Sequence, residues 1–366
     1  MESTPAKPLP ERIMSIDVLR GFDMFWIANG KSLFVALVLI VCGGTVPGWL
    51  DYHLEHPEWN GFSAWDMIMP LFLFIVGASM PFAFQRRKES GKGGARLYLK
   101  ILRRVAILWV LGMIAQGHLL TFDISKLHFY SNTLQSIASG YLVASLVLLH
   151  LPLAGQIAVT AFLLLFYGLL MMFVPVPGHG AWLLTPDANL AMWVDKAVLG
   201  RFRDGTHYTW VLSSLGFSAT VLLGVHAGQI LLSPRTQMRK LYWLIGLGLA
   251  CLAAGRVWGI WLPIIKHIWT SSMALWAAGW SFLLLAAFYA VVDMMGFRKW
   301  AFFFMIIGMN SIVAYMVPEL INLNMFAGFL GAKTTGVLEL ALDMLSFVIL
   351  WLVLYFMYRK RLFVRI

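Results

Sequence analysis

One stretch of the sequence places groups that can exchange protons at the start of a long apolar run. Residues 53–84 read HLEHPEWNGFSAWDMIMPLFLFIVGASMPFAF, in which His56 and Asn60 precede the apolar part and Asp66 lies inside it. A carboxylate bonded to an imidazole fixes its tautomer and raises its basicity, as in other pairs of a base and its orienting group. The spacing fits such a pair, but it also fits an ordinary interfacial histidine.

Charged groups elsewhere in apolar segments give further candidates. A charge in the hydrocarbon layer costs about 2.5–3.5 kcal/mol or more, so it usually has a partner or lines a cavity. Asp17 and Arg20 are three residues apart and share a helix face, which predicts an ion pair. Arg103 and Arg104 fit either ordinary anchoring at the cytoplasmic face or phosphate binding, for which a guanidinium is well suited.

Several further polar residues, one of them an arginine, also interrupt the apolar segments. Taken singly, each is best explained as a hydrogen-bonding contact between helices, but as a set they indicate a polar interior. The sequence has no Walker A motif, no nucleophile elbow, no zinc-protease motif and no metal-spaced histidine cluster, and we expect no metal. The set comprises Gln135, His226, Gln229, Arg256, Asn310 and Ser311.

The elements that must position these residues are membrane helices. Of the 366 residues, 60% are hydrophobic and only 12% are charged, whereas a soluble domain carries about 25% charge. This composition predicts an all-α integral membrane protein. A spanning helix needs about 20 mostly apolar residues, and about ten windows qualify. They lie near 16–43, 61–84, 97–118, 132–151, 153–174, 209–232, 239–261, 268–292, 299–322 and 336–358.

Basic residues assign the two sides of the membrane. With ten helices, most of the 28 Lys and Arg residues fall on one side, which the positive-inside rule makes the cytoplasm, together with both termini. The net charge of +11 then reflects topology and lipid attraction, and we expect no nucleic-acid partner. We expect residues 1–12 to be a flexible cytoplasmic segment and 13–366 to be a single transmembrane domain.

Two local features are predicted as well. Pro70 and Pro81 should disturb the helix that follows Asp66, with Pro70 breaking a backbone hydrogen bond near mid-membrane. The connection 175–208 contains TPDANLAMWVDKAVLG, whose helical spacing predicts a short helix on the outer surface, capped by Thr185 or Asp187.

The motifs together resemble one family of membrane acyltransferases. RIMSIDVLRGFDMFWIANG, followed by HPEWNGFSAWDMIMPLFLFIVG, is similar to the heparan-alpha-glucosaminide N-acetyltransferase family. The likeness continues through LQSIASGYLVASLVLL, SSLGFSATVLLGVHAGQIL, PIIKHIWTSSMAL, GMNSIVAYM and YRKRLFVRI. It implies transfer of acetyl from cytoplasmic acetyl-CoA to the amine of glucosamine or a related amino sugar across the membrane. Compared with the family's lysosomal enzyme, we expect no large extra N-terminal domain and a much shorter 175–208 connection, which leaves the acceptor open.

The resemblance also implies roles for individual residues. The family's essential histidine falls on His56, its helix-2 aspartate on Asp66 and a basic residue on Arg104, and an asparagine falls on or near Asn29. We add Asn60 as a second donor to the acetyl carbonyl, and Arg103, Arg86 and Arg87 as further phosphate ligands. The pantetheine arm would pass Gln135, His226 and Asn310.

The predicted protein is therefore a multi-pass enzyme of the bacterial inner membrane, an acetyl-CoA-dependent amino-sugar N-acetyltransferase whose partners are its amino sugar and membrane lipid. Direct transfer and an acetyl-histidine route both stay open. A small-residue face such as GLGLACLAAG at 246–255 would also suit a homodimer. The main alternative is a secondary transporter such as a sugar permease. A structural membrane protein ranks last, because it gives no reason for Asp66, Arg104 and His56.

Overall fold

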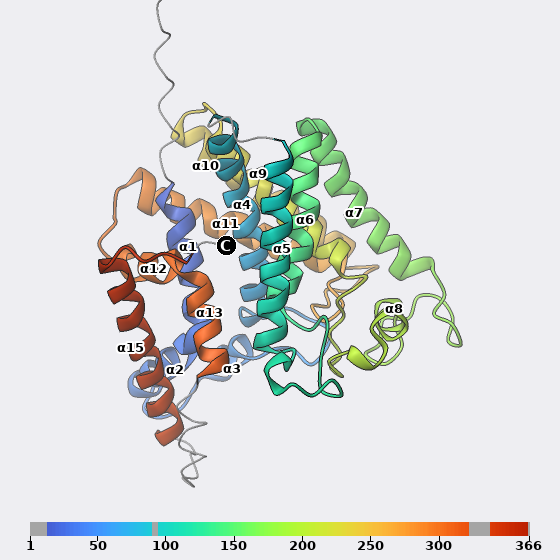
Figure 1. Ribbon diagram of the computed structural model, residues 1–366, viewed down its shortest axis with the longest axis horizontal. Coiled ribbons are helices and arrows are strands. Elements are labelled where there is room, and N and C mark those ends of the chain that lie inside the picture. Colours follow the sequence, from blue (N-terminus) through green and yellow to red (C-terminus); the bar gives the residue numbers. More distant parts are fainter. Residues whose placement is uncertain (1–12, 90–93, 322–336, 365–366) are drawn as a thin grey trace, which may run out of the picture.

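The computed structural model describes residues 13–89, 94–321 and 337–364, which form helices joined by loops (Figure 1). In these ranges no strand is present beyond two isolated bridges. The predicted segment 1–12 lies outside the described residues. Eight helices are long and apolar enough to cross a membrane: Met14–Val41, Trp65–Arg86, Thr133–His150, Leu153–Phe173, Ser214–Leu232, Gln237–Trp258, Ser271–Met294 and Leu338–Arg359. This confirms an all-α, multi-pass membrane protein.

The two remaining predicted segments are also helical. α12 (Ala301–Met309) and α13 (Ser311–Leu320) form a pair bent by 76° at Asn310, which counts as a ninth span if the pair is one crossing. α5 (Ala95–Ala115) is 21 residues long but carries Lys100, Arg103 and Arg104, which makes it less apolar than the others. With both included, the described helices match the ten predicted windows.

Glycine contacts between α4 (Ile68–Glu89) and α9 (Ser214–Leu232) bring the centre of the bundle together. A Cβ on Gly77 would lie 1.9 Å from the carbonyl oxygen of Val221, and a Cβ on Gly224 would lie 2.0 Å from that of Phe74. The two backbones therefore touch because neither position carries a side chain, as is common where membrane helices pack closely.

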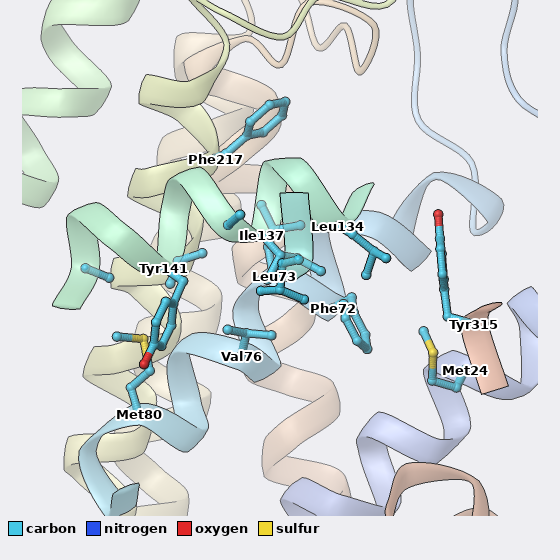
Figure 2. Close-up of a cluster of buried hydrophobic side chains, with 14 of the residues drawn as sticks. Met24, Phe72, Leu73, Val76, Met80, Leu134, Ile137, Tyr141, Phe217 and Tyr315 are labelled. Carbon is cyan, nitrogen blue, oxygen red and sulfur yellow. The ribbon is translucent and has the colours of Figure 1, made fainter. Parts of the chain in front are cut away.

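Large apolar side chains fill the space around this contact (Figure 2). Leu73 and Val76 of α4 belong to one buried cluster with Ile137 and Tyr141 of α6 (Thr133–His150) and with Phe217 of α9. All five are at most 5% exposed. The α4–α6–α9 core is thus rigid, and the loops that carry polar residues are attached to its ends.

The bundle has two chemically different ends (Figure 1). With α5 and the bent pair counted as crossings, the connections 42–64, 116–132, 174–213 and 259–270 share one end, which we call the far end. The other end, which we call the basic end, holds the start of α1 (Met14–Phe25), the start of α5, the α9–α10 connection and residues 295–300. The basic residues at this end include Arg86, Arg96, Arg235, Arg239, Arg298, Arg359 and Lys360.

Pro70 does not break its helix near mid-membrane, whereas a different helix, the first span, is broken. Pro70 is the third residue of α4 and follows the 3₁₀ turn Trp65–Met67, so any backbone hydrogen bond that it removes lies near the start of the span and not near mid-membrane. The first span is the one that is interrupted. Ala28 and Asn29 have non-helical backbone angles between α1 and α2 (Lys31–Val41), and Asn29 has a φ of 66°. Asparagine is one of the few residues that tolerates this left-handed conformation.

The predicted surface helix is present as α8 (Leu190–Leu199), but its cap differs from the prediction. Asn189 Oδ1 accepts a hydrogen bond of 2.8 Å from the Met192 N–H and caps the helix. The Thr185 hydroxyl instead accepts from the Ala188 N–H in the preceding turn, at 3.2 Å. Both polar side chains can close a turn, and only the position of the first helical residue decides which one is the cap.

Candidate active site

His56 and Asp66 form the predicted pair. His56 Nδ1 lies 2.6 Å from Asp66 Oδ1. Because an ionised carboxylate can only accept, Nδ1 carries the proton in this bond, and in the neutral imidazole the lone pair is then on Nε2. The Asp66 side chain is 2% exposed, whereas that of His56 is 38% exposed. The carboxylate is therefore held inside the protein, while the imidazole at the far end is partly exposed.

Asp66 is held by the start of its own helix. Its second oxygen, Oδ2, accepts the Ser63 N–H at 3.0 Å, and the Ser63 hydroxyl accepts the Asp66 N–H at 3.3 Å. This reciprocal pattern is a capping box, for which the sequence signature is Ser or Thr followed three residues later by an acidic residue. Asp66 thus caps the helix with one oxygen and orients His56 with the other.

Lys266 is the residue at this site that sequence reasoning missed. It lies in the connection between α10 (Gln237–Trp258) and α11 (Ser271–Phe288), and its side chain is 8% exposed. Its Nζ is 3.3 Å from Asp66 Oδ1 and 3.4 Å from His56 Nδ1. Burial lowers the pKa of Lys266, and the charge of Asp66 opposes that shift. The only signal in the sequence is a single lysine within the otherwise apolar GIWLPIIKHIWT.

Three aromatic side chains lie beside His56, Asp66 and Lys266. The His267 ring stacks on Trp59, with centroids 5.1 Å apart, and its other neighbour is Tyr208 at 4.4 Å. Burial, followed by the charge of Lys266, lowers the pKa of His267 to about 4, so this ring stays neutral. Burial and the charge of Asp66 raise the pKa of Tyr208 to about 12, so its hydroxyl keeps its proton and can donate.

Hydrogen bonds between loops hold the site together. The Gly61 N–H donates to the Ile264 carbonyl, and the Thr209 N–H donates to the His267 carbonyl, both at 3.0 Å. The Trp59 Nε1–H donates to the Leu184 carbonyl at 2.7 Å. Residues 53–66, 174–213 and 259–270 therefore form one structure at the far end, although long sequence separations divide them.

The two predicted amide donors lie on different elements. Asn60 is exposed, four residues after His56, and Asn29 lies at the break between α1 and α2. Lys31, two residues after Asn29, bonds Glu55 at 2.7 Å and lies 4.8 Å from the Trp65 ring centroid. In the described part of the chain neither asparagine side chain has a hydrogen-bond partner.

The predicted phosphate ligands differ in their surroundings. The Arg104 guanidinium lies 4.4 Å from the Tyr141 ring centroid, and its buried Nε has no hydrogen-bond partner among the described residues. Arg104 is nine residues inside α5, or about 14 Å from the basic end. Arg103 and Arg86 are exposed, and the side chain of Arg87 lies outside the described residues.

The three residues predicted along the donor arm have separate local partners. Gln135 accepts from the Ser131 N–H and donates to the Phe129 carbonyl, which closes the start of α6. His226 contacts Thr160 on α7 (Leu153–Phe173).

Asn310 donates to the Leu362 carbonyl and accepts from the Val364 N–H, so it binds the chain after α15 (Val337–Arg359). No described hydrogen bond joins Gln135, His226 and Asn310 to one another.

Comparison with known proteins agrees with the motifs. No family model matches the chain. The chain is 25% identical to human heparan-alpha-glucosaminide N-acetyltransferase over 98% of its own length and 60% of the relative. It is 24% identical to the mouse protein of the same name, over 97% of this chain and 61% of the relative. The chain thus spans about three fifths of the curated relatives that it matches. The chain is therefore similar to two heparan-alpha-glucosaminide N-acetyltransferases along almost its whole length.

Proposed function

We propose that the protein transfers acetyl from acetyl-CoA to the amine of an amino sugar such as glucosamine. The names of the relatives support N-acetyl transfer to a glucosaminide. The observation that carries the proposal is the 2.6 Å contact between His56 and Asp66, which leaves His56 Nε2 free at an accessible position. Acyl transfer to an amine needs such a base, because the nitrogen must lose a proton as it bonds to carbon.

His56 takes that proton at Nε2. Acetyl-CoA supplies a thioester, whose carbon–sulfur bond breaks as the new amide bond forms. In direct transfer, Nε2 accepts the proton that the amine loses. In the two-step route, Nε2 itself first receives the acetyl group and then passes it to the amine. Asp66 fixes the imidazole in the tautomer that both routes require.

Lys266 neutralises the buried charge of Asp66. With Asp66 ionised and Lys266 protonated, the pair carries no net charge, so His56 is not needed as a counter-ion. A neutral imidazole is the form that acts as a base or a nucleophile.

The acetyl carbonyl also needs hydrogen-bond donors. Negative charge develops on its oxygen in the transition state, and fixed donors stabilise that charge. Asn29 and Asn60 have amide groups without partners in the described part of the chain, and the Tyr208 hydroxyl is a third donor on the same side. We propose that these three donors form hydrogen bonds with the acetyl carbonyl oxygen.

Arg104 fits the charged part of the donor. A guanidinium with a buried and unpartnered Nε is an incomplete site, and phosphate is the anion whose geometry suits it. Arg104 is therefore the residue that would hold the coenzyme A phosphates, with Arg103 and Arg86 nearer the surface. Gln135, His226 and Asn310 each have local hydrogen-bond partners, so we assign none of them to the pantetheine arm.

The two ends of the bundle suggest sidedness. By the positive-inside rule the basic end faces the cytoplasm, where acetyl-CoA is made, and the far end with His56 faces outward. In a bacterium this places the protein in the inner membrane with the acceptor in the periplasm. The coenzyme A phosphates would then lie at Arg104, in the basic half of the bundle, and the chemistry would take place at the far end.

Reconstituted protein tests the proposal. Labelled acetyl-CoA and glucosamine are added to proteoliposomes, and N-acetylglucosamine is measured in each compartment. Product formed on the side opposite to acetyl-CoA supports transmembrane transfer. A matched sample without acetyl-CoA tests the alternative. If labelled sugar accumulates there and no acetylated product forms with acetyl-CoA, the protein is a sugar permease and the proposal is wrong.

A further inference from the structure

A cavity lies in the membrane-spanning part of the bundle, apart from the candidate active site. It has a volume of about 790 Å³ and lies between α7 and α10, which both pack on α9. Its wall is mostly apolar and includes Leu153, Ile157, Leu164, Leu223, Leu247 and Phe282. We call this cavity the α7–α10 groove.

The groove covers about half of the membrane. Its α7 residues run from Leu153 to Leu164, eleven residues or about 16 Å, against a hydrocarbon thickness of about 30 Å. Leu153 begins α7 at the basic end. Leu153 and Ile157 are 56% and 52% exposed, so the groove opens toward lipid and not into the protein interior. The groove therefore extends through about one leaflet of the bilayer.

A basic residue lies at the end of the groove nearest the membrane surface. Arg235 lies in the α9–α10 connection, and its guanidinium is 5.3 Å from the Trp243 ring centroid. In the described ranges no carboxylate pairs with Arg235. An arginine beside a tryptophan is typical of the level of lipid headgroups, where the cation meets phosphate.

Polar side chains occur in the groove just below this level. Gln229 and His226 are three and six residues before the end of α9, or about 4.5 and 9 Å deeper. Gln229 donates to Gln156 at 2.6 Å, and His226 is 3.1 Å from the Thr160 hydroxyl. This depth is that of the ester groups of a glycerolipid, below its phosphate and above its acyl chains.

We propose that the α7–α10 groove binds one anionic glycerophospholipid of the leaflet at the basic end. Its phosphate contacts Arg235, its ester oxygens lie beside Gln229 and His226, and one acyl chain fills the apolar part. The order of cation, polar and apolar residues along the groove matches the order of groups along such a lipid. This assignment does not depend on the enzymatic activity proposed above.

Native mass spectrometry of the detergent-purified protein tests this proposal. Phosphatidylglycerol and phosphatidylcholine with identical acyl chains serve as probes, in the absence of acetyl-CoA. We expect tighter binding of phosphatidylglycerol, and an Arg235→Ala loss of affinity for it of roughly fivefold. Arg239→Ala is the matched control, because Arg239 is exposed at the same end but does not line the groove.

A second pair of variants tests the acyl site. Ala161 lines the groove and is exposed, so Ala161→Trp should fill it without disturbing the core and should reduce binding of both lipids. Leu165→Trp places the same side chain on the exposed face of α7 outside the groove and should leave binding unchanged. Equal losses for Arg235→Ala and Arg239→Ala, or unchanged binding in Ala161→Trp, would overturn the proposal.

Discussion

Removal of the Asp66 carboxylate should strongly destabilise the protein, because it leaves Lys266 buried without an anion. The two side chains are 2% and 8% exposed, and their charged atoms are 3.3 Å apart. At an effective dielectric constant of about 20, this separation corresponds to about 5 kcal/mol of attraction. Loss of one partner of a buried pair costs about 3–5 kcal/mol in other proteins. Asp66→Asn should therefore cost several kcal/mol.

The loss of stability caused by Asp66→Asn should depend on the presence of Lys266. In Asp66→Asn combined with Lys266→Met, no unpaired charge is buried, so the double variant should be more stable than Asp66→Asn alone. Thermal unfolding of the four proteins in one detergent measures this coupling. If the losses of the two single variants simply add in the double variant, Asp66 and Lys266 do not interact and the geometry is wrong.

The direction of the pH effect follows from Lys266. Burial lowers its folded-state pKa below the ordinary value, so the unfolded state binds more protons between the two pKa values. Stability from this group therefore rises as pH increases through that window. Asp66→Asn removes the charge that opposes the shift, which widens the window. The deficit of Asp66→Asn should be smaller at pH 9 than at pH 6, and an equal or larger deficit at pH 9 would contradict the reasoning.

Three further predictions concern other parts of the chain. Arg104→Ala should weaken acetyl-CoA binding, measured by calorimetry, more than Arg103→Ala, since only Arg104 has a buried unpartnered nitrogen. Asp195→Ala should lower the melting temperature, because it removes the acceptor of the Trp210 and Val211 N–H groups, at about 1–3 kcal/mol for each donor left unsatisfied. Gly224→Ala should prevent close packing of α4 and α9, whereas Gly246→Ala, with open space around it, should be neutral or stabilising by thermal unfolding.

The membrane architecture could be predicted from the sequence because apolar length and loop charge are local properties. The pairing of His56 with Asp66 was also accessible, since both lie within eleven residues. Lys266 was not, because its contact with Asp66 spans 200 residues and depends on how α10 and α11 are placed. A lone lysine in a loop gives no sign of its burial.

The sequence leaves the role of a residue ambiguous where that role depends on the position of a helix start. The spacing of Ser63 and Asp66 fits a capping box as well as it fits a histidine partner, and in the structure Asp66 has both roles. Pro70 follows the 3₁₀ turn at the start of its span, so it does not break the helix near mid-membrane. The exact start of a helix decides such cases, and apolar patterns place it only to within a few residues.

Acetyl transfer by a His56 variant tests the central claim most directly. Purified wild type, His56→Ala and His179→Ala are given labelled acetyl-CoA and glucosamine, and the labelled amide is counted. His179 is an exposed histidine in the 174–213 connection and controls for the loss of an imidazole. We predict that His179→Ala keeps the wild-type rate and that His56→Ala loses at least about a hundredfold, the usual contribution of a positioned base. An equal rate in wild type and His56→Ala would show that His56 is not the catalytic base.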